Sequence, residues 1–121
     1  MSAARHIAVA AALALALVAP SATGHAFLDK ASPPVGSSVT AAPAQVTLKF
    51  SERVEPAFSR VQVVDAAGQR VDKADARVVD DGNVLAVSLA PLPRGRYTVR
   101  WRVLSVDTHV TEGDYTFEVA R

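Results

Sequence analysis

Short runs in which apolar and polar residues alternate recur along the chain after residue 44. They cover residues 45–50, 60–65, 77–79, 84–89, 97–103 and 115–119. A period of two is typical of strands that bury one face, and Asp80-Asp81-Gly82-Asn83 has the composition of a hairpin turn. With the short segment Ala26–Lys30 there are about seven runs, and residues 25–121 contain no amphipathic helical pattern. The pattern predicts an all-β fold, an antiparallel β-sandwich of about seven strands, with an immunoglobulin-like spacing of Pro, Gly and Tyr before the run at 97.

The N-terminus has the three parts of a secretory signal peptide. Arg5 precedes an uncharged apolar stretch at residues 7–19, and small or turn-forming residues follow at 20–24. The stretch is shorter than the roughly 20 residues that a membrane-spanning helix needs. We therefore expect residues 1–24 to be a signal peptide, with residues 25–121 as the exported domain; an uncleaved N-terminal anchor is the alternative. Cleavage after Gly24 would make His25 the first residue, whereas cleavage after Ala26 would remove that histidine.

Composition narrows the function classes. The chain has 121 residues, 13 basic and 12 acidic, and this near-neutral balance argues against a nucleic-acid-binding protein. There is no cysteine, and the one methionine is Met1, so the predicted exported domain contains neither disulfide nor sulfur ligand. The sequence shows no phosphate-binding loop and no pairing of a nucleophile with a base. We expect a protein that is not an enzyme.

The candidate chemistry lies in Asp107-Thr108-His109. Residues i and i+2 of an extended segment point the same way, so Asp107 and His109 are expected to face one ion together. His25, as the first residue, would add its α-amine and its imidazole. These nitrogen and oxygen ligands suit Cu(II), with Zn(II) as the competing ion. Taken singly, each residue also has an ordinary interpretation: His109 as a surface residue, Asp107 as a turn acceptor, and His25 as a residue beside a cleavage site.

The sequence also resembles the CopC family of periplasmic copper-binding proteins. The resemblance spans the exported domain and rests on His25-Ala26-Phe27-Leu28, Ser32-Pro33-Pro34-Val35-Gly36, Val46-Thr47-Leu48-Lys49-Phe50-Ser51-Glu52, residues 95–103, Ser105-Val106-Asp107-Thr108-His109 and Gly113. It implies a Greek-key, immunoglobulin-like β-sandwich or barrel that binds Cu(II) through His25, Asp107 and His109. It also implies that Glu52 lies beside the copper, where it would orient the terminal histidine or coordinate weakly.

The resemblance further implies a role and a partner. Some family members carry a methionine-rich loop for Cu(I), which this chain lacks, so a single Cu(II) site is expected. The protein would sequester or carry copper in the periplasm as a monomer and contribute to copper resistance, beside a separate CopD-type inner-membrane protein. Two alternatives remain: a metal-free immunoglobulin-like interaction module, and a copper-dependent oxidative enzyme of the lytic polysaccharide monooxygenase kind, which shares only the terminal histidine.

Overall fold

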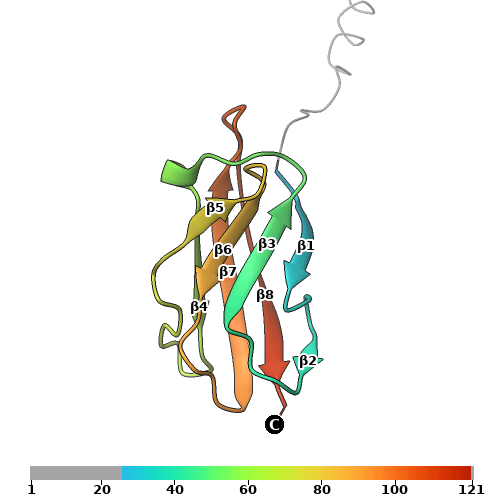
Figure 1. The fold of residues 1–121 in the computed structure, drawn as a ribbon, viewed down its shortest axis with the longest axis vertical. Helices are drawn as coiled ribbons and strands as arrows, with labels where there is room; N and C mark the ends of the chain where they lie inside the picture. The colour runs from blue at the N-terminus through green and yellow to red at the C-terminus, as the bar shows by residue number, and fades with distance from the viewer. Residues whose placement is uncertain (1–25, 121) are drawn as a thin grey trace, which may run out of the picture.

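Two four-stranded sheets pack face to face in the computed structural model, which describes residues 26–120 (Figure 1). In spatial order the first sheet contains β1 (Leu28–Ser32), β3 (Gln45–Phe50), β6 (Val84–Ser88) and β5 (Arg77–Val79). The second sheet contains β2 (Ser38–Val39), β8 (Val110–Val119), β7 (Gly95–Leu104) and β4 (Arg60–Val64). A short 3-10 helix, η2 (Pro56–Phe58), precedes β4. The predicted all-β sandwich is confirmed.

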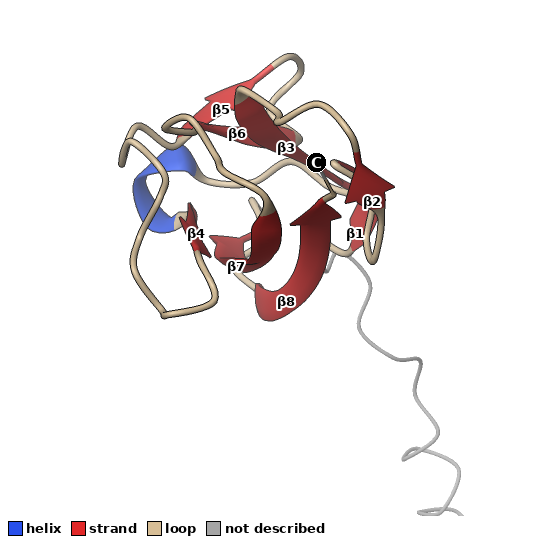
Figure 2. Cartoon of the chain, turned by 90° about the horizontal axis from the view of Figure 1, so that it is seen from below, coloured by secondary structure: helices blue, strands red, loops and turns tan. Residues whose placement is uncertain are grey.

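The connections between strands interlock the two sheets. Only β5–β6 and β7–β8 join neighbours within a sheet, whereas the other connections cross from one sheet to the other. Figure 2 shows the two layers from below, with η2 beside β4 at one edge. No helix within residues 26–120 is long and apolar enough to cross a membrane.

Two features of the strands differ from the sequence-based expectation. β2 lies in a stretch without alternation and pairs in parallel with β8, through Ser38 and Val39, so the second sheet is mixed rather than purely antiparallel. β8 begins at Val110, five residues before the predicted run. Its first half is polar and contains Gly113, which hides the alternation, but it pairs continuously with β7 out to Leu104↔Val110.

The alternating apolar residues meet between the sheets. Phe50, Leu48, Leu85 and Phe117 are among the largest fully buried side chains, and burying such a side chain contributes about 1.5–3 kcal/mol. Tyr97 stacks on Phe117 with ring centroids 5.5 Å apart, and its hydroxyl donates to the Pro93 carbonyl at 2.5 Å. This Tyr97 contact matches the tyrosine corner of immunoglobulin-like domains.

Three connecting segments meet at one end of the sandwich. Figure 1 places the start of β1, the β3–β4 connection and the β7–β8 turn together at its top. Hydrogen bonds join them: the Ser51 amide donates to the Phe27 carbonyl at 2.8 Å, and the Val106 amide donates to the Arg53 carbonyl at 3.1 Å. Of the candidate residues predicted from the sequence, Asp107 and His109 belong to the β7–β8 turn and Glu52 to the β3–β4 connection.

Candidate metal centre

The turn between β7 and β8 carries Asp107 and His109. It is closed by backbone hydrogen bonds from Ser105 to the His109 carbonyl and from Thr108 to the Ser105 carbonyl, both 2.9 Å long. Thr108 has a φ of 75°, in the left-handed region. The expectation of an extended segment is therefore wrong, because the chain reverses at Thr108 and the alternation rule does not apply there.

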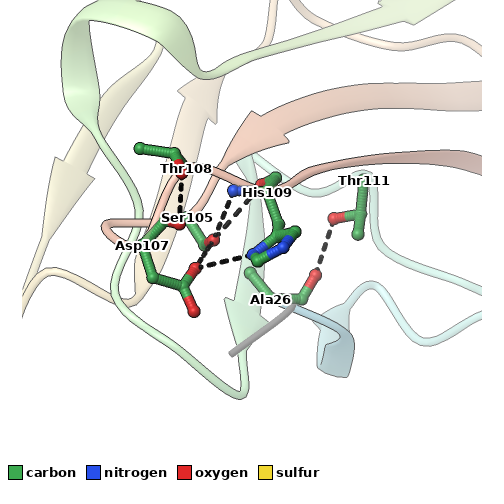
Figure 3. A network of polar contacts seen from close by, with 6 residues as sticks. All are labelled: Ala26, Ser105, Asp107, Thr108, His109 and Thr111. Atoms are coloured by element: carbon green, nitrogen blue, oxygen red, sulfur yellow. Dashed lines mark hydrogen bonds and ion pairs between the residues drawn. The ribbon is translucent and has the colours of Figure 1, made fainter. Parts of the chain in front are cut away.

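The side chains of Asp107 and His109 nevertheless meet, because the turn folds them onto each other. His109 Nδ1 lies 3.3 Å from Asp107 Oδ1, and each side chain is 43% exposed (Figure 3). A neutral His109 that donates its Nδ1 proton to Asp107 carries its lone pair on Nε2. The pair thus combines a carboxylate with an oriented imidazole.

Ser105 holds this arrangement through hydrogen bonds of its side-chain hydroxyl. It is a polar residue buried among the apolar core residues, with 0% of its surface exposed. Its hydroxyl donates to Asp107 Oδ1 and accepts from the His109 amide at 3.2 Å. The bond from Ser105 is the main reason that the pKa of Asp107 lies below its ordinary value; partial desolvation opposes the shift, and His109 adds to it. Asp107 is therefore a carboxylate at neutral pH.

The first described residues are fixed beside the turn. Ala26 is fully buried, and its carbonyl accepts a hydrogen bond of 2.7 Å from the hydroxyl of Thr111 on β8 (Figure 3). The Phe27 amide donates to the Ser51 hydroxyl at 2.9 Å. His25, the third predicted ligand, lies outside the described residues.

Glu52 lies in the β3–β4 connection and is exposed. Its neighbours Ser51 and Arg53 bond to Phe27 and Val106, so its backbone runs between the first residues and the turn. Within residues 26–120, no three His, Asp or Glu side chains gather as a metal site. The structure therefore brings Asp107 and His109 together, and it places Glu52 in a connection whose backbone is hydrogen-bonded to their turn through Arg53.

Sequence reasoning gave no role to Ser105 or Thr111. Ser105 continues the inward-facing parity of Tyr97, Val99 and Val103 on β7. A hydroxyl at an inward position, directly before two candidate ligands, is a signal that the alternation could have supplied. Thr111 had no comparable signal, because its partner is 85 residues away.

The donor chemistry of the turn selects among ions. A carboxylate oxygen and an imidazole nitrogen are available, and the chain has no cysteine. Such a set suits Cu(II) and Zn(II) and gives no soft ligand for Cu(I). The fold and the turn together define an immunoglobulin-like β-sandwich domain that presents paired nitrogen and oxygen ligands at one end.

Proteins with related sequences narrow this class. The family profile described as the CopC domain matches residues 28–120, and the chain belongs to the CopC family. Protein YobA of Escherichia coli (strain K12) is 43% identical over 111 residues, which cover 90% of each chain.

Solved structures agree with this family. The crystal structure of CopC from Methylosinus trichosporium OB3b has a TM-score of 0.70 and 38% identity, covering 79% of this chain and 94% of that one. PcoC, described as a methionine-rich copper resistance protein from Escherichia coli, has a TM-score of 0.70 and 33% identity, covering 78% and 97%. The resemblance to the CopC family is confirmed.

Proposed function

We propose that this protein binds one Cu(II) ion as cargo at the end of the sandwich formed by its first residues and the β7–β8 turn. The ligands are the α-amine and imidazole of His25, a carboxylate oxygen of Asp107 and the imidazole of His109, and Glu52 orients the terminal histidine. The protein sequesters or carries copper in the periplasm and thereby contributes to copper resistance. It acts as a monomeric binding protein, not as an enzyme, beside a CopD-type membrane protein.

The observation that carries this proposal is the contact between Asp107 and His109 beside the tethered Ala26. His25 is bonded directly to Ala26, and successive Cα atoms are about 3.8 Å apart. The Thr111 hydroxyl on β8 donates to the Ala26 carbonyl at 2.7 Å. The first residue of a chain that begins at His25 would therefore be bonded to a residue that β8 already holds. An α-amine and an imidazole there would complete a set of three nitrogens and one oxygen, which suits tetragonal Cu(II).

Burial of Ala26 also favours one of the two cleavage sites. Cleavage after Ala26 would remove a residue that is fully buried and hydrogen-bonded to Thr111. Cleavage after Gly24 keeps that residue in the core and exposes the α-amine of His25. This supports residues 1–24 as the signal peptide and residues 25–121 as the exported domain.

The absence of sulfur supports Cu(II) over Cu(I). PcoC is described as rich in methionine, whereas the single methionine of this chain is Met1, which lies in the predicted signal peptide. Thioether and thiolate ligands select Cu(I), while imidazole, amine and carboxylate favour the divalent ion.

The test compares ligand variants in the exported, processed protein. Mass spectrometry should give a chain that begins at His25, and EPR should show one tetragonal Cu(II) per chain. Asp107→Ala and His109→Ala should each exceed the roughly 10–100-fold loss of affinity typical of residues that only orient ligands. Asp114→Ala, which removes an exposed acid from β8, is the matched control and should bind normally.

A form that retains Gly24 tests the terminal chelate separately. Its first nitrogen near the turn is an amide, which coordinates far less readily at neutral pH than an amine, so Cu(II) affinity should fall. Wild-type affinity in both His109→Ala and the extended form would contradict the copper site. The metal-free interaction module would then be the better explanation of the domain.

A further inference from the structure

Two adjoining hollows, together called the groove, lie along the β4–β7 pair, and the second reaches the start of β8 beside the β7–β8 turn. One part, of about 300 Å³, lies over Arg60, Gln62, Arg100 and Arg102. A second part, of about 440 Å³, shares Arg60 and Arg102 with the first and is also lined by the apolar residues Phe58, Leu104 and Val110. The groove is therefore basic along one half and apolar along the other.

The basic half concentrates positive charge at a cost to the sheet. Arg60 lies directly opposite Arg102 in the antiparallel register, and Gln62 lies opposite Arg100. Like charges directly opposite each other destabilise a sheet. Arg102 is compensated by Glu112 at 3.3 Å, but Arg60 and Arg100 form no ion pair within residues 26–120. Arg100 lies opposite Asp114 on β8, so Arg60 is the least compensated of the three. An anionic group beside Arg60 would relieve its repulsion with Arg102.

The apolar half belongs to an uneven distribution of exposed hydrophobic side chains. Five large hydrophobic residues are exposed in the described part of the chain, and four of them lie at the end that carries the turn: Phe27, Phe58, Val106 and Val110. Phe58 is the most exposed, at 68%. Exposed apolar surface gathered beside a polar rim is typical of a protein-interaction site.

We propose that this groove binds an extended segment of a partner protein in which acidic residues are followed by an apolar one. The carboxylates lie against Arg60 and Arg100, and arginine forks suit carboxylates well. The apolar side chain contacts Phe58 and Val110. From Arg100 to Leu104 the groove follows five residues of β7, so it accommodates about five residues of an extended peptide.

The position of the groove gives the interaction a consequence. Val110, which lines the apolar half, directly follows His109 in the chain. A partner held in the groove is therefore next to the turn that carries Asp107 and His109. The proposal goes beyond copper binding and does not depend on it, because the groove residues are not proposed ligands.

The experiment measures binding of fluorescein-labelled peptides to the processed, metal-free protein at low ionic strength, where surface charges act most strongly. Two peptides each contain four glutamates and one leucine, which stands at the C-terminal end in one peptide and at the N-terminal end in the other. A peptide with lysines in place of the glutamates is the control. Anisotropy should show that a leucine-bearing acidic peptide binds and the lysine peptide does not. Amide shifts in NMR spectra should lie on β4, β7 and η2.

Matched charge reversals test the site. Arg60→Glu should weaken binding at least about tenfold, because attraction becomes repulsion, whereas Arg94→Glu, in the exposed β6–β7 connection, should change it less than about twofold for the same change in net charge. Arg60→Glu places an acid opposite Arg102, so the fold is retained, and its Cu(II) affinity should match the wild type. Phe58→Ser should weaken binding of the leucine-bearing peptide but not of an all-glutamate peptide.

Several outcomes would overturn the proposal. Equal losses in Arg60→Glu and Arg94→Glu would show only a general attraction of charge. Binding of anionic phospholipid vesicles with the same dependence on Arg60, and no peptide binding, would assign the face to a membrane surface instead. Because peptide binding is measured without copper and Cu(II) affinity without peptide, failure of either proposal leaves the other standing.

Discussion

Removal of the buried hydroxyl of Ser105 should weaken both the turn and the proposed copper site. In Ser105→Ala, Asp107 Oδ1 loses the hydrogen bond donated by the Ser105 hydroxyl, and the His109 amide loses the hydroxyl that accepts from it at 3.2 Å. The hydroxyl makes two part-buried hydrogen bonds, each of which contributes about 0.5–1.5 kcal/mol, so we expect a loss of about 1–3 kcal/mol. Asp107 and His109 remain present but less firmly oriented, which should lower Cu(II) affinity by about 10–100-fold.

A second hydroxyl offers a matched control for this substitution. Ser59 Oγ accepts the amide of Leu104 at 3.2 Å, at the same end of β7, but it does not contact Asp107. Ser59→Ala should lower stability by about 0.5–1.5 kcal/mol through one lost hydrogen bond and leave Cu(II) affinity unchanged. Thermal melts of the metal-free forms and competition titrations with a fluorescent chelator measure the two effects separately.

Titration of Asp107 gives a third measurement. The Ser105 hydroxyl is the main cause of the lowered pKa of Asp107, so the pKa should rise toward its ordinary value of 3.8 in Ser105→Ala. NMR titration of the carboxyl carbon would detect this change. Normal copper affinity in Ser105→Ala, or an equal loss in Ser59→Ala, would refute the idea that Ser105 positions the ligands.

The remaining predictions concern the scaffold. Gly113→Ala should lower the free energy of unfolding by about 1–3 kcal/mol through overpacking, because the new Cβ would lie 2.6 Å from the ring of Trp101. A thermal melt and the fluorescence of the single tryptophan measure this effect. An unchanged melting temperature would contradict it. Trp101→Ala should cost about 3 kcal/mol by removing contacts with Phe50, while copper affinity of the folded fraction stays normal. Burial alone would raise the pKa of Asp72, but bonds from Arg70 and two amides lower it below 3.8. Asp72 therefore stabilises the fold above pH 3.8 and loses this effect as the pH falls through its folded pKa; acid unfolding of Asp72→Asn should lack this step.

The alternation of residue types predicted most of the fold because burial on one face imposes it. The runs at 45–50, 60–65, 77–79 and 84–89 became β3 to β6 with nearly the expected bounds. β2 was not predicted because a parallel pairing of only two residues leaves no periodic pattern in the sequence. The first half of β8 was not predicted because its residues are mostly polar and it is held to β7 by backbone pairing, which leaves no side-chain pattern.

The candidate site was predictable in its residue types but not in its geometry. Asp107 and His109 were chosen for their chemistry, and the assumption of an extended segment gave the right neighbours for the wrong reason. A left-handed Thr108 is uncommon for a residue that is not glycine, so nothing in the residue type indicated the turn. The burial of Ser105 could be predicted only by continuing the inward-facing alternation of β7 one residue past its end at Leu104.

The proposed site depends on tertiary structure as much as on its ligands. Ala26 and Thr111 are 85 residues apart, and Phe27 and Ser51 are 24 apart, so the two hydroxyl contacts form only when the sandwich is folded. Chain termini are poorly ordered unless something holds them, and ordering a residue costs about 1–2 kcal/mol. Because Thr111 and Ser51 already fix the residues next to His25, less of that cost falls on ion binding. An ion that binds only the folded form would in turn stabilise it by about 4.1 kcal/mol at 1,000 times its Kd. In the proposed site, such an ion would link His25 to the β7–β8 hairpin in a chain without disulfides. In the proposed site, the affinity for copper would therefore depend partly on the hydroxyls of Thr111 and Ser51, neither of which is a proposed ligand.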